Sequence, residues 1–176
     1  MVLPPHKPKK WVQAPGNIII DTIPLLLFLT GIYDKKIISK FKRLMKYGYD
    51  DKSFEILQLF LAYSKTITVT PGVLAEVSNF AEQLKSDRFA GLIRDNIRIL
   101  EAMGEIYIPK DRILDSDEIF KFGFTDTSII FAAKNNDCGV LTRDHRLCSY
   151  CQKLGIRAYH LDRVLEMGAP FKRTML

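Results

Sequence analysis

The alternation of short strand-like runs with longer helical patterns is the feature of this sequence that most constrains its fold. Apolar or β-branched runs of strand character cover residues 17–21, 66–69, 105–108, 139–142 and 156–160. Helical patterns lie between them, at residues 24–29, in two parts of 35–63, from 71 onward, and at 87–103, 115–122, 126–134 and 146–154. Strands that alternate with helices favour parallel pairing and helices on both faces of the sheet. The sequence therefore predicts an α/β fold, a three-layer α/β/α sandwich around a central, mainly parallel sheet.

Local signals indicate where individual helices begin and end. Pro24 suits the first turn of the first helix, and Thr70 followed by Pro71 is typical of a helix start. Thr125 is expected to cap the helix that begins at the next residue, and Gly155 to close the helix before the last strand.

The length of the chain fits one domain. A domain of 176 residues buries roughly 70% of the surface that its unfolded chain exposes. We expect this domain at residues 17–167, with no internal repeat and no second domain. Residues 1–16, rich in proline and basic side chains, lack apolar periodicity and predict a flexible basic arm, either idle or in contact with nucleic-acid backbone. Residues 168–176 are expected to form a C-terminal tail.

Composition narrows the class of protein and its compartment. Hydrophobic residues make up 47% and charged residues 26% of the chain, which is the balance of a globular protein. The net charge of +6 favours polyanionic partners, nucleic acid before membrane. Three cysteines, an odd number, predict a reducing, cytoplasmic setting. Asp21 interrupts the apolar stretch 18–33, which argues against a signal peptide or membrane span and predicts no membrane partner.

Four acids stand where an open parallel sheet places its functional residues, beyond the carboxyl ends of the strands. Asp21 ends the first strand, and Glu76 lies in the helix after the second. Asp126 opens a helix, and Asp144 follows the strand that ends at Thr142. Such carboxylates repel one another unless a cation lies between them, and hard oxygen ligands fit Mg²⁺ or Mn²⁺ rather than zinc or copper. These ions activate water and orient a phosphodiester, which predicts hydrolysis of a nucleic-acid backbone.

The four acids lie in stretches that resemble, in order, the motifs of the PIN-domain ribonuclease family. IIIDTIPLLLFL is similar to the first motif, TPGVLAEV to the second, FGFTDTSIIFAA to the third and VLTRDHRL to the fourth, over about residues 17–165. The resemblance implies a PIN fold and an endoribonuclease activity that depends on Mg²⁺ or Mn²⁺ held by Asp21, Glu76, Asp126 and Asp144. It also implies that Thr142, two positions before the last aspartate, orients that acid or a bound water.

The sequence departs from the family pattern at two places. Ile23 stands where many members have a small polar residue, so a supporting hydrogen bond is expected to be missing. The segment 35–63 makes the chain longer than the compact toxin-like members, which weakens the toxin role more than the fold. A toxin with an antitoxin partner, RNA processing, RNA decay and defence against foreign nucleic acid stay open, and the resemblance allows a homodimer.

Other functions compete with the nuclease. Each acid alone has a structural explanation, as a turn residue, a solvated helix residue or a helix cap. A PIN fold without catalysis would be an RNA- or protein-binding module. A phosphoacceptor or phosphatase built on Asp21 needs a second acid close by, but Ile20 and Ile23 occupy those positions. Arg143, His145 and Arg146 flank the last acid and are candidates for phosphate contacts, or else part of the solvated surface.

Two further patterns have simpler structural explanations. Cys148 and Cys151 form a C-x2-C pair near His145, which invites a zinc site. On a helix these cysteines are expected to face the sheet as small hydrophobic residues. Asp115 and Asp117 form a D-x-D pair, which we interpret as part of a helix start capped by Asp115 or the serine after it.

Overall fold

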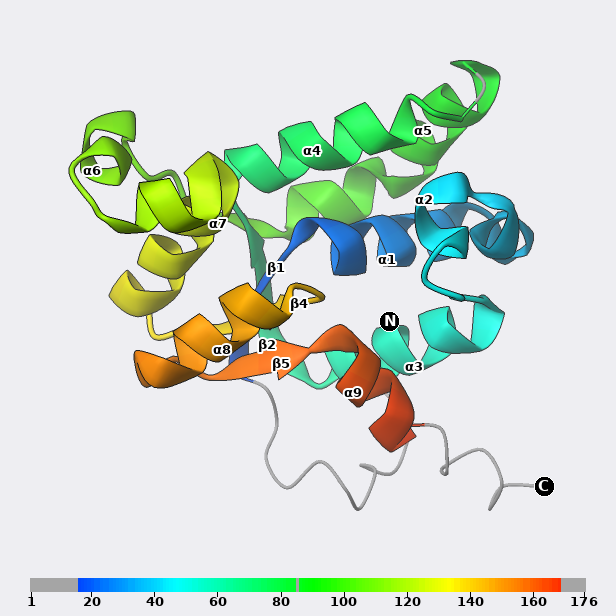
Figure 1. Cartoon of the computed structure of the whole chain (residues 1–176). Coiled ribbons are helices and arrows are strands. Elements are labelled where there is room, and N and C mark those ends of the chain that lie inside the picture. Colours follow the sequence, from blue (N-terminus) through cyan, green and yellow to red (C-terminus); the bar gives the residue numbers. More distant parts are fainter. Residues whose placement is uncertain (1–15, 85, 169–176) are drawn as a thin grey trace.

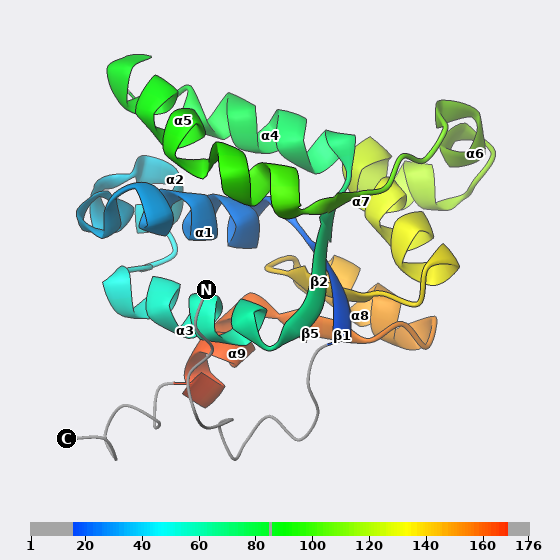
Figure 2. The same cartoon turned by 180° about the vertical axis from the view of Figure 1, so that it is seen from behind.

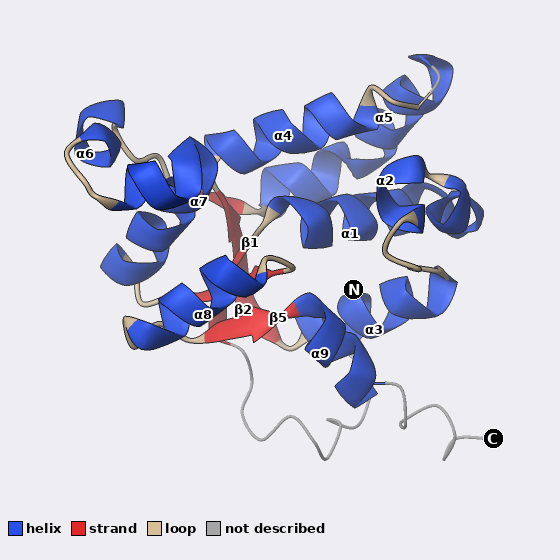
Figure 3. Cartoon of the chain, viewed as in Figure 1, coloured by secondary structure: helices blue, strands red, loops and turns tan. Residues whose placement is uncertain are grey.

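A five-stranded, all-parallel sheet forms the centre of the protein, as the sequence predicts. The computed structural model describes residues 16–84 and 86–168, so the expected arm and tail lie outside the described residues except for Gly16 and Gly168. The strands are β1 (Gly16–Ile20), β2 (Ser64–Val69), β3 (Gly104–Glu105), β4 (Gly139–Thr142) and β5 (Ala158–His160). Their order in the sheet is β3-β2-β1-β4-β5 (Figure 3).

Helices cover both faces of this sheet, which confirms the three-layer prediction. They are α1 (Thr22–Asp34), the 3-10 helix η1 (Lys35–Lys40), α2 (Lys42–Met45), α3 (Asp51–Ala62), α4 (Pro71–Ala81), α5 (Ser86–Ala102), α6 (Lys110–Leu114), α7 (Glu118–Asn135), α8 (His145–Lys153) and α9 (Leu161–Gly168). Figure 1 shows α7 and α8 on one side of the sheet and α1 and α3 on the other, with α4 and α5 packed along α1. The opposite view agrees (Figure 2). None of the described helices combines the length and apolar character needed to cross a membrane.

Strand β1 lies in the middle of the sheet, and its sequence explains that position. Ile18, Ile19 and Ile20 are completely buried, as expected for a β-branched run covered on both faces. The chain winds from β1 toward β3 in one direction and through β4 to β5 in the other. The order of strands therefore reverses between β1 and β4, and such a switch point opens a crevice at the carboxyl ends of the two strands. Asp21 follows β1 directly at this crevice.

Helix α1 is buried along most of its length between the sheet and other helices. Its sequence TIPLLLFLTG is buried from Thr22 to Gly31, so apolar residues are required on every side rather than on one stripe. Gly31 allows α3 to approach closely. A Cβ atom built at Gly31 would lie 2.1 Å from Cδ2 of Phe54, a separation that real atoms do not adopt. The close approach of α1 and α3 thus depends on this glycine.

The segment 35–47 differs from the helix that its pattern predicts. It forms η1 and the one-turn helix α2, interrupted at Phe41, which has extended backbone angles. Ile37, Ile38, Phe41 and Leu44 are buried nevertheless. The apolar pattern therefore correctly identified these four buried side chains but not the continuous helix, and Met45, which the same pattern assigns to the core, is exposed. The strand predicted at residues 105–108 is also shorter than expected, because only β3 pairs with β2 before the chain leaves the edge of the sheet.

The two helices predicted on either side of Gly123 form the single element α7, which bends at that residue. Gly123 has φ 76° and ψ −176°, a combination that is accessible only to glycine. The expected cap by Thr125 is wrong: its backbone carbonyl accepts a hydrogen bond from Ser128 Oγ at 2.7 Å, and Asp126 lies inside the helix. Thr70 occupies the cap position of α4, but its hydroxyl accepts from Ser128 Oγ at 3.0 Å instead of capping.

Two other expected helix ends have different outcomes. Asp115 ends α6 and does not cap α7, so that prediction is wrong; the following Ser116 donates to the carbonyl of Ile113 at 2.9 Å. Gly155 follows α8 with φ 76°, as predicted for a residue that closes a helix.

Candidate active site

Asp21 is held at the end of β1 by donors on both of its carboxylate oxygens. Oδ1 accepts a hydrogen bond from the backbone N–H of Thr22 at 2.6 Å, and Oδ2 accepts from Oγ1 of Thr142 at 2.6 Å. The side chain is only 7% exposed. Burial raises the pKa of this carboxyl above its ordinary value, and the charges of Glu76 and Asp144 add to that effect, whereas the two hydrogen bonds oppose it. Asp21 is therefore a buried, rigidly oriented acid.

Glu76 reaches the same region from α4. Its Oε2 accepts a hydrogen bond from Oγ1 of Thr22 at 2.8 Å. Thr22 thus connects two acids, since its backbone N–H binds Asp21 and its hydroxyl binds Glu76. The apolar Ile23 lines the cavity without a polar group of its own.

Asp126 is the acid with the least support from the protein. It lies three residues after the bend at Gly123, and its carboxylate accepts no hydrogen bond from residues 16–84 or 86–168. Burial raises its pKa to about 7, and the charges of Asp21, Asp144 and Glu76 contribute in that order. The positive charge of Arg146 lowers it only in part. Burial and the charges of the neighbouring acids therefore raise the pKa of both Asp21 and Asp126.

Asp144 follows β4 and begins α8. Its Oδ1 accepts from the backbone N–H groups of Arg146 and Leu147 at 2.6 and 3.0 Å, so it caps the helix, as its structural explanation requires. Its own N–H donates to Oγ1 of Thr142 at 2.9 Å. Thr142 is completely buried and so joins the backbone of Asp144 to the carboxylate of Asp21. The second oxygen, Oδ2, accepts no hydrogen bond within the described ranges.

All four predicted acids line one cavity of about 290 Å³. The lining residues are Asp21, Thr22, Ile23, Arg43, Tyr47, Glu76, Phe80, Asp126, Arg143 and Asp144. The type of ligand atom, carboxylate oxygen, suits a hard divalent cation. However, in the part of the chain that is described, no three acid, histidine or cysteine side chains converge closely enough to hold a metal ion as they stand. The donor chemistry therefore fits Mg²⁺ or Mn²⁺, whereas the present spacing is too wide for three of these side chains to bind one ion.

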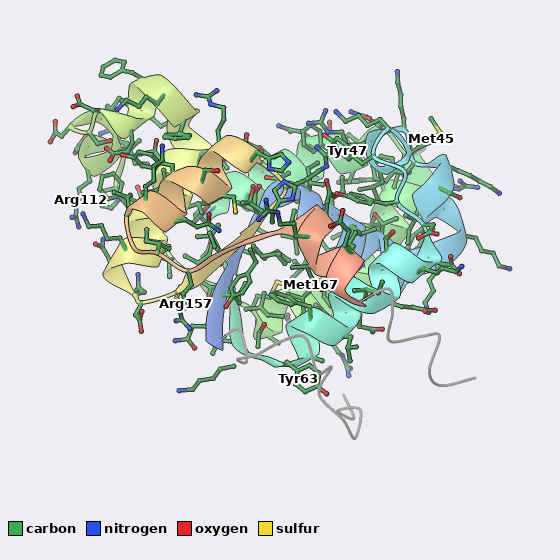
Figure 4. All side chains as sticks on the ribbon, turned by 60° about the horizontal axis from the view of Figure 1, so that its bottom comes forward. Met45, Tyr47, Tyr63, Arg112, Arg157 and Met167 are labelled. Carbon is green, nitrogen blue, oxygen red and sulfur yellow. The ribbon has the colours of Figure 1, made fainter. Side chains whose placement is uncertain are left out.

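A basic and aromatic wall lines the cavity beside the acids, and of its members the sequence analysis named only Arg143. The guanidinium of Arg43 lies 3.8 Å from the ring centroid of Phe80, and that of Arg143 lies 3.7 Å from the ring centroid of Tyr47. Figure 4 shows Tyr47 on the side of its segment that faces the body of the molecule, whereas Met45 points outward. Arg43 and Tyr47 come from the segment whose role the sequence left open. Its run of lysines was the only available signal.

The three predicted phosphate contacts do not form one group. Arg143 lines the acid cavity, but its Nε donates to Oη of Tyr49 at 3.1 Å and its Nη2 lies 3.5 Å from Asp162. His145 and Arg146 line a separate, more open depression of about 410 Å³. Arg146 Nη2 donates to the carbonyl of Lys121 at 2.9 Å. Arg143 is thus partly buried and held by the protein, whereas His145 and Arg146 are exposed on the surface, as the alternative explanation predicts.

The cysteines adopt the predicted positions. Cys148 and Cys151 are buried and have free thiols, and burial raises the pKa of both. His145 stacks on His160 with ring centroids 3.7 Å apart. Within the described residues no zinc-type group of ligands is found here, and the two cysteines are hydrophobic packing residues.

Comparison with known proteins gives no family. No family model matches the chain, and no curated protein matches it. Among solved structures, the chain is similar to a domain of a functionally unknown protein from Methanocaldococcus jannaschii, with a TM-score of 0.39 and 17% identity over 82% of this chain and 89% of that one. Function therefore has to be inferred from the chemistry of the site.

Proposed function

We propose that this protein is a divalent-cation-dependent endoribonuclease, whose cation, Mg²⁺ or Mn²⁺, is held by Asp21, Glu76, Asp126 and Asp144. The observation that carries the proposal is the convergence of these acids from different elements on one cavity, where the pKa of Asp126 is raised to about 7. A fold does not maintain such mutual repulsion without a compensating gain, and a cation that neutralises the acids supplies it. The resemblance of the four motifs to PIN-domain ribonucleases supports the same function.

The chain's own residues would prepare this chemistry. Thr142 and Thr22 fix the carboxylates of Asp21 and Glu76 through their hydroxyl groups. The amides of α8 fix Oδ1 of Asp144. Asp126 accepts no such bond and is the acid most able to change position or protonation. A bound cation would lower the pKa of water and orient a phosphodiester, and the acids would have to move closer to hold it.

Position and charge favour nucleic acid as the substrate. The site lies at the carboxyl ends of β1 and β4, where the strand order reverses. Outside the acid cavity the chain has an excess of basic side chains, with a net charge of +6 overall. We propose RNA in a cytoplasmic setting, with a toxin, processing, decay or defence role, and an antitoxin or second copy as the protein partner.

A catalytically silent RNA- or protein-binding module is the second candidate, and one observation favours it. The described side chains contain no ready-made group of three metal ligands. A phosphoacceptor of the flavodoxin-like type has less support, because those folds have the strand order 2-1-3-4-5, which differs from the order found here.

Cleavage of a mixed RNA pool by the purified protein tests the proposal. The protein and its Asp126→Asn variant are compared with Mn²⁺, with Mg²⁺ and with chelator, and Asp95→Asn, an exposed acid on α5, is the matched control. We expect metal-dependent fragments from the parent and the control but not from Asp126→Asn. Equal cleavage by Asp126→Asn would reject the site, and intact folded protein that cuts nothing would favour the binding module.

A further inference from the structure

The segment 35–47 has a charge pattern unlike the rest of the chain. Its sequence KKIISKFKRLMKY contains six basic residues and no acid. Lys36, Lys40, Lys42 and Lys46 are exposed, while all the apolar side chains between them except Met45 are buried against the domain. The segment thus presents a row of positive charges at the surface and is anchored from beneath. Such a row lowers the electrostatic cost of bringing a polyanion to the acid cavity beside it.

Arg43 is the basic residue of this row that enters the cavity. Its guanidinium lies flat on Phe80, 3.8 Å from the ring centroid, and lines the same cavity as the four acids. Its Nε is buried and has no hydrogen-bond partner in the described parts of the chain. No ion pair joins Arg43 to any described acid, although the cavity holds several. Its Nη groups form no hydrogen bond with the described residues either, and unpartnered terminal donors on a side chain that lines a cavity point to a ligand.

Arg143, the other arginine of the cavity, has a different role. Tyr49, Asp162 and the ring of Tyr47 all engage its guanidinium. Tyr49 in turn donates to Oδ1 of Asp162 at 2.6 Å. Arg143 therefore fixes Tyr47 and the segment that carries it. We assign Arg143 as a positioning residue. Arg43 is then the arginine of this cavity whose N–H groups are available to a ligand.

We propose that segment 35–47 is the RNA-binding platform of the site, and that Arg43 contacts a backbone phosphate beside the carboxylates. This inference rests on the proposed nuclease function and assigns the substrate contact to residues that lie between the four resembling motifs rather than in any of them. A planar guanidinium with free N–H groups is suited to two oxygens of one phosphate. The exposed lysines would then contact neighbouring phosphates as point charges, without reading the base sequence.

Binding of a short, fluorescein-labelled single-stranded RNA, measured by anisotropy in chelator at several salt concentrations, tests the platform without requiring cleavage. The variants are Arg43→Gln, Arg43→Lys and the double variant Lys42→Gln/Lys46→Gln, whose two positions are exposed and do not threaten folding. Arg98→Gln, an exposed arginine on α5, removes the same charge elsewhere and is the matched control. Thermal unfolding of each variant verifies that it is folded.

We expect Arg43→Gln to weaken binding about tenfold and to reduce the slope of log K against log salt by about 0.7, the value for one single-strand phosphate contact. Arg43→Lys keeps the slope but binds less tightly, the double lysine variant reduces the slope further, and Arg98→Gln changes neither quantity. Parent-like affinity and slope in both Arg43→Gln and the double variant would overturn the proposal. If RNA binding is weakened by these variants but the parent protein cleaves no RNA, the nuclease proposal is wrong and the binding platform stands. If the parent cleaves RNA and Arg43→Gln cleaves it with an unchanged KM, the platform is wrong and the nuclease proposal stands.

Discussion

The raised pKa of Asp126 predicts that this acid destabilises the metal-free protein at neutral and alkaline pH. Its pKa is about 7 in the native state against an ordinary value of 3.8. Between these two values the native state binds more protons than the unfolded state, so the stability that the raised pKa provides at low pH is lost as pH rises through about 7. At about 1.4 kcal/mol for each pKa unit, the largest loss is about 4 kcal/mol. Solvent screening at this partly exposed cavity reduces it to about 2 kcal/mol.

Denaturant unfolding in chelator, at pH 5 and pH 8, measures this effect. Asp126→Asn removes the charge and keeps the shape of the side chain, so we expect the variant to be about 2 kcal/mol more stable than the parent at pH 8 and closer to it at pH 5. Asp95→Asn on α5 should leave the pH dependence unchanged, since that residue is exposed. A variant no more stable than the parent at pH 8 would refute the electrostatic reasoning, because the four acids would then not repel one another as described.

Three other outcomes follow from the structure. Thr142→Val should lower the kcat of metal-dependent RNA cleavage at least about tenfold, because Asp21 loses its 2.6 Å hydrogen bond. Thr142→Ser keeps the hydroxyl and should retain most of the parent's activity. Equal rates for the Val and Ser variants would contradict this role of Thr142. Thr22→Val should act in the same way through Glu76, with unchanged kinetics as the opposing result. Gly31→Ala should lower the free energy of unfolding by about 1 to 3 kcal/mol or more, because its Cβ would overlap Phe54; a parent-like melting temperature would contradict that packing.

The elements that carry the acids could be predicted because their signals are local. A fully buried run of isoleucines ending in Asp21 indicates a central strand, and Gly139 to Thr142 repeats the pattern before Asp144. The carboxyl ends of parallel strands then bring such residues to one edge of the sheet. The support of these acids is less local: the backbone N–H of Thr22 binds the adjacent Asp21, but the hydroxyl groups of Thr22 and Thr142 bind Glu76 and Asp21 from distant positions in the sequence.

The rest of the site depends on packing between distant segments, which no local pattern specifies. Arg43 meets Phe80 and Tyr47 meets Arg143 only after the segment 35–47 has folded against α4 and the end of β4. Expected caps failed for a similar reason. Ser128 Oγ of α7 contacts Thr70 Oγ1 at the start of α4, and this tertiary contact takes the place of the local cap expected from Thr70. Ser128 Oγ also donates to the carbonyl of Thr125 within α7.

Binding of Mn²⁺ to the purified protein, followed by the loss of the electron paramagnetic resonance signal of the free ion, tests the central claim most directly. The proposal predicts that the parent protein and Asp95→Asn bind Mn²⁺, that Asp126→Asn binds it at least about tenfold more weakly, and that Mg²⁺ competes. If the parent binds no Mn²⁺, or if Asp126→Asn binds it equally well, the four acids are not a metal site and the proposed nuclease is wrong.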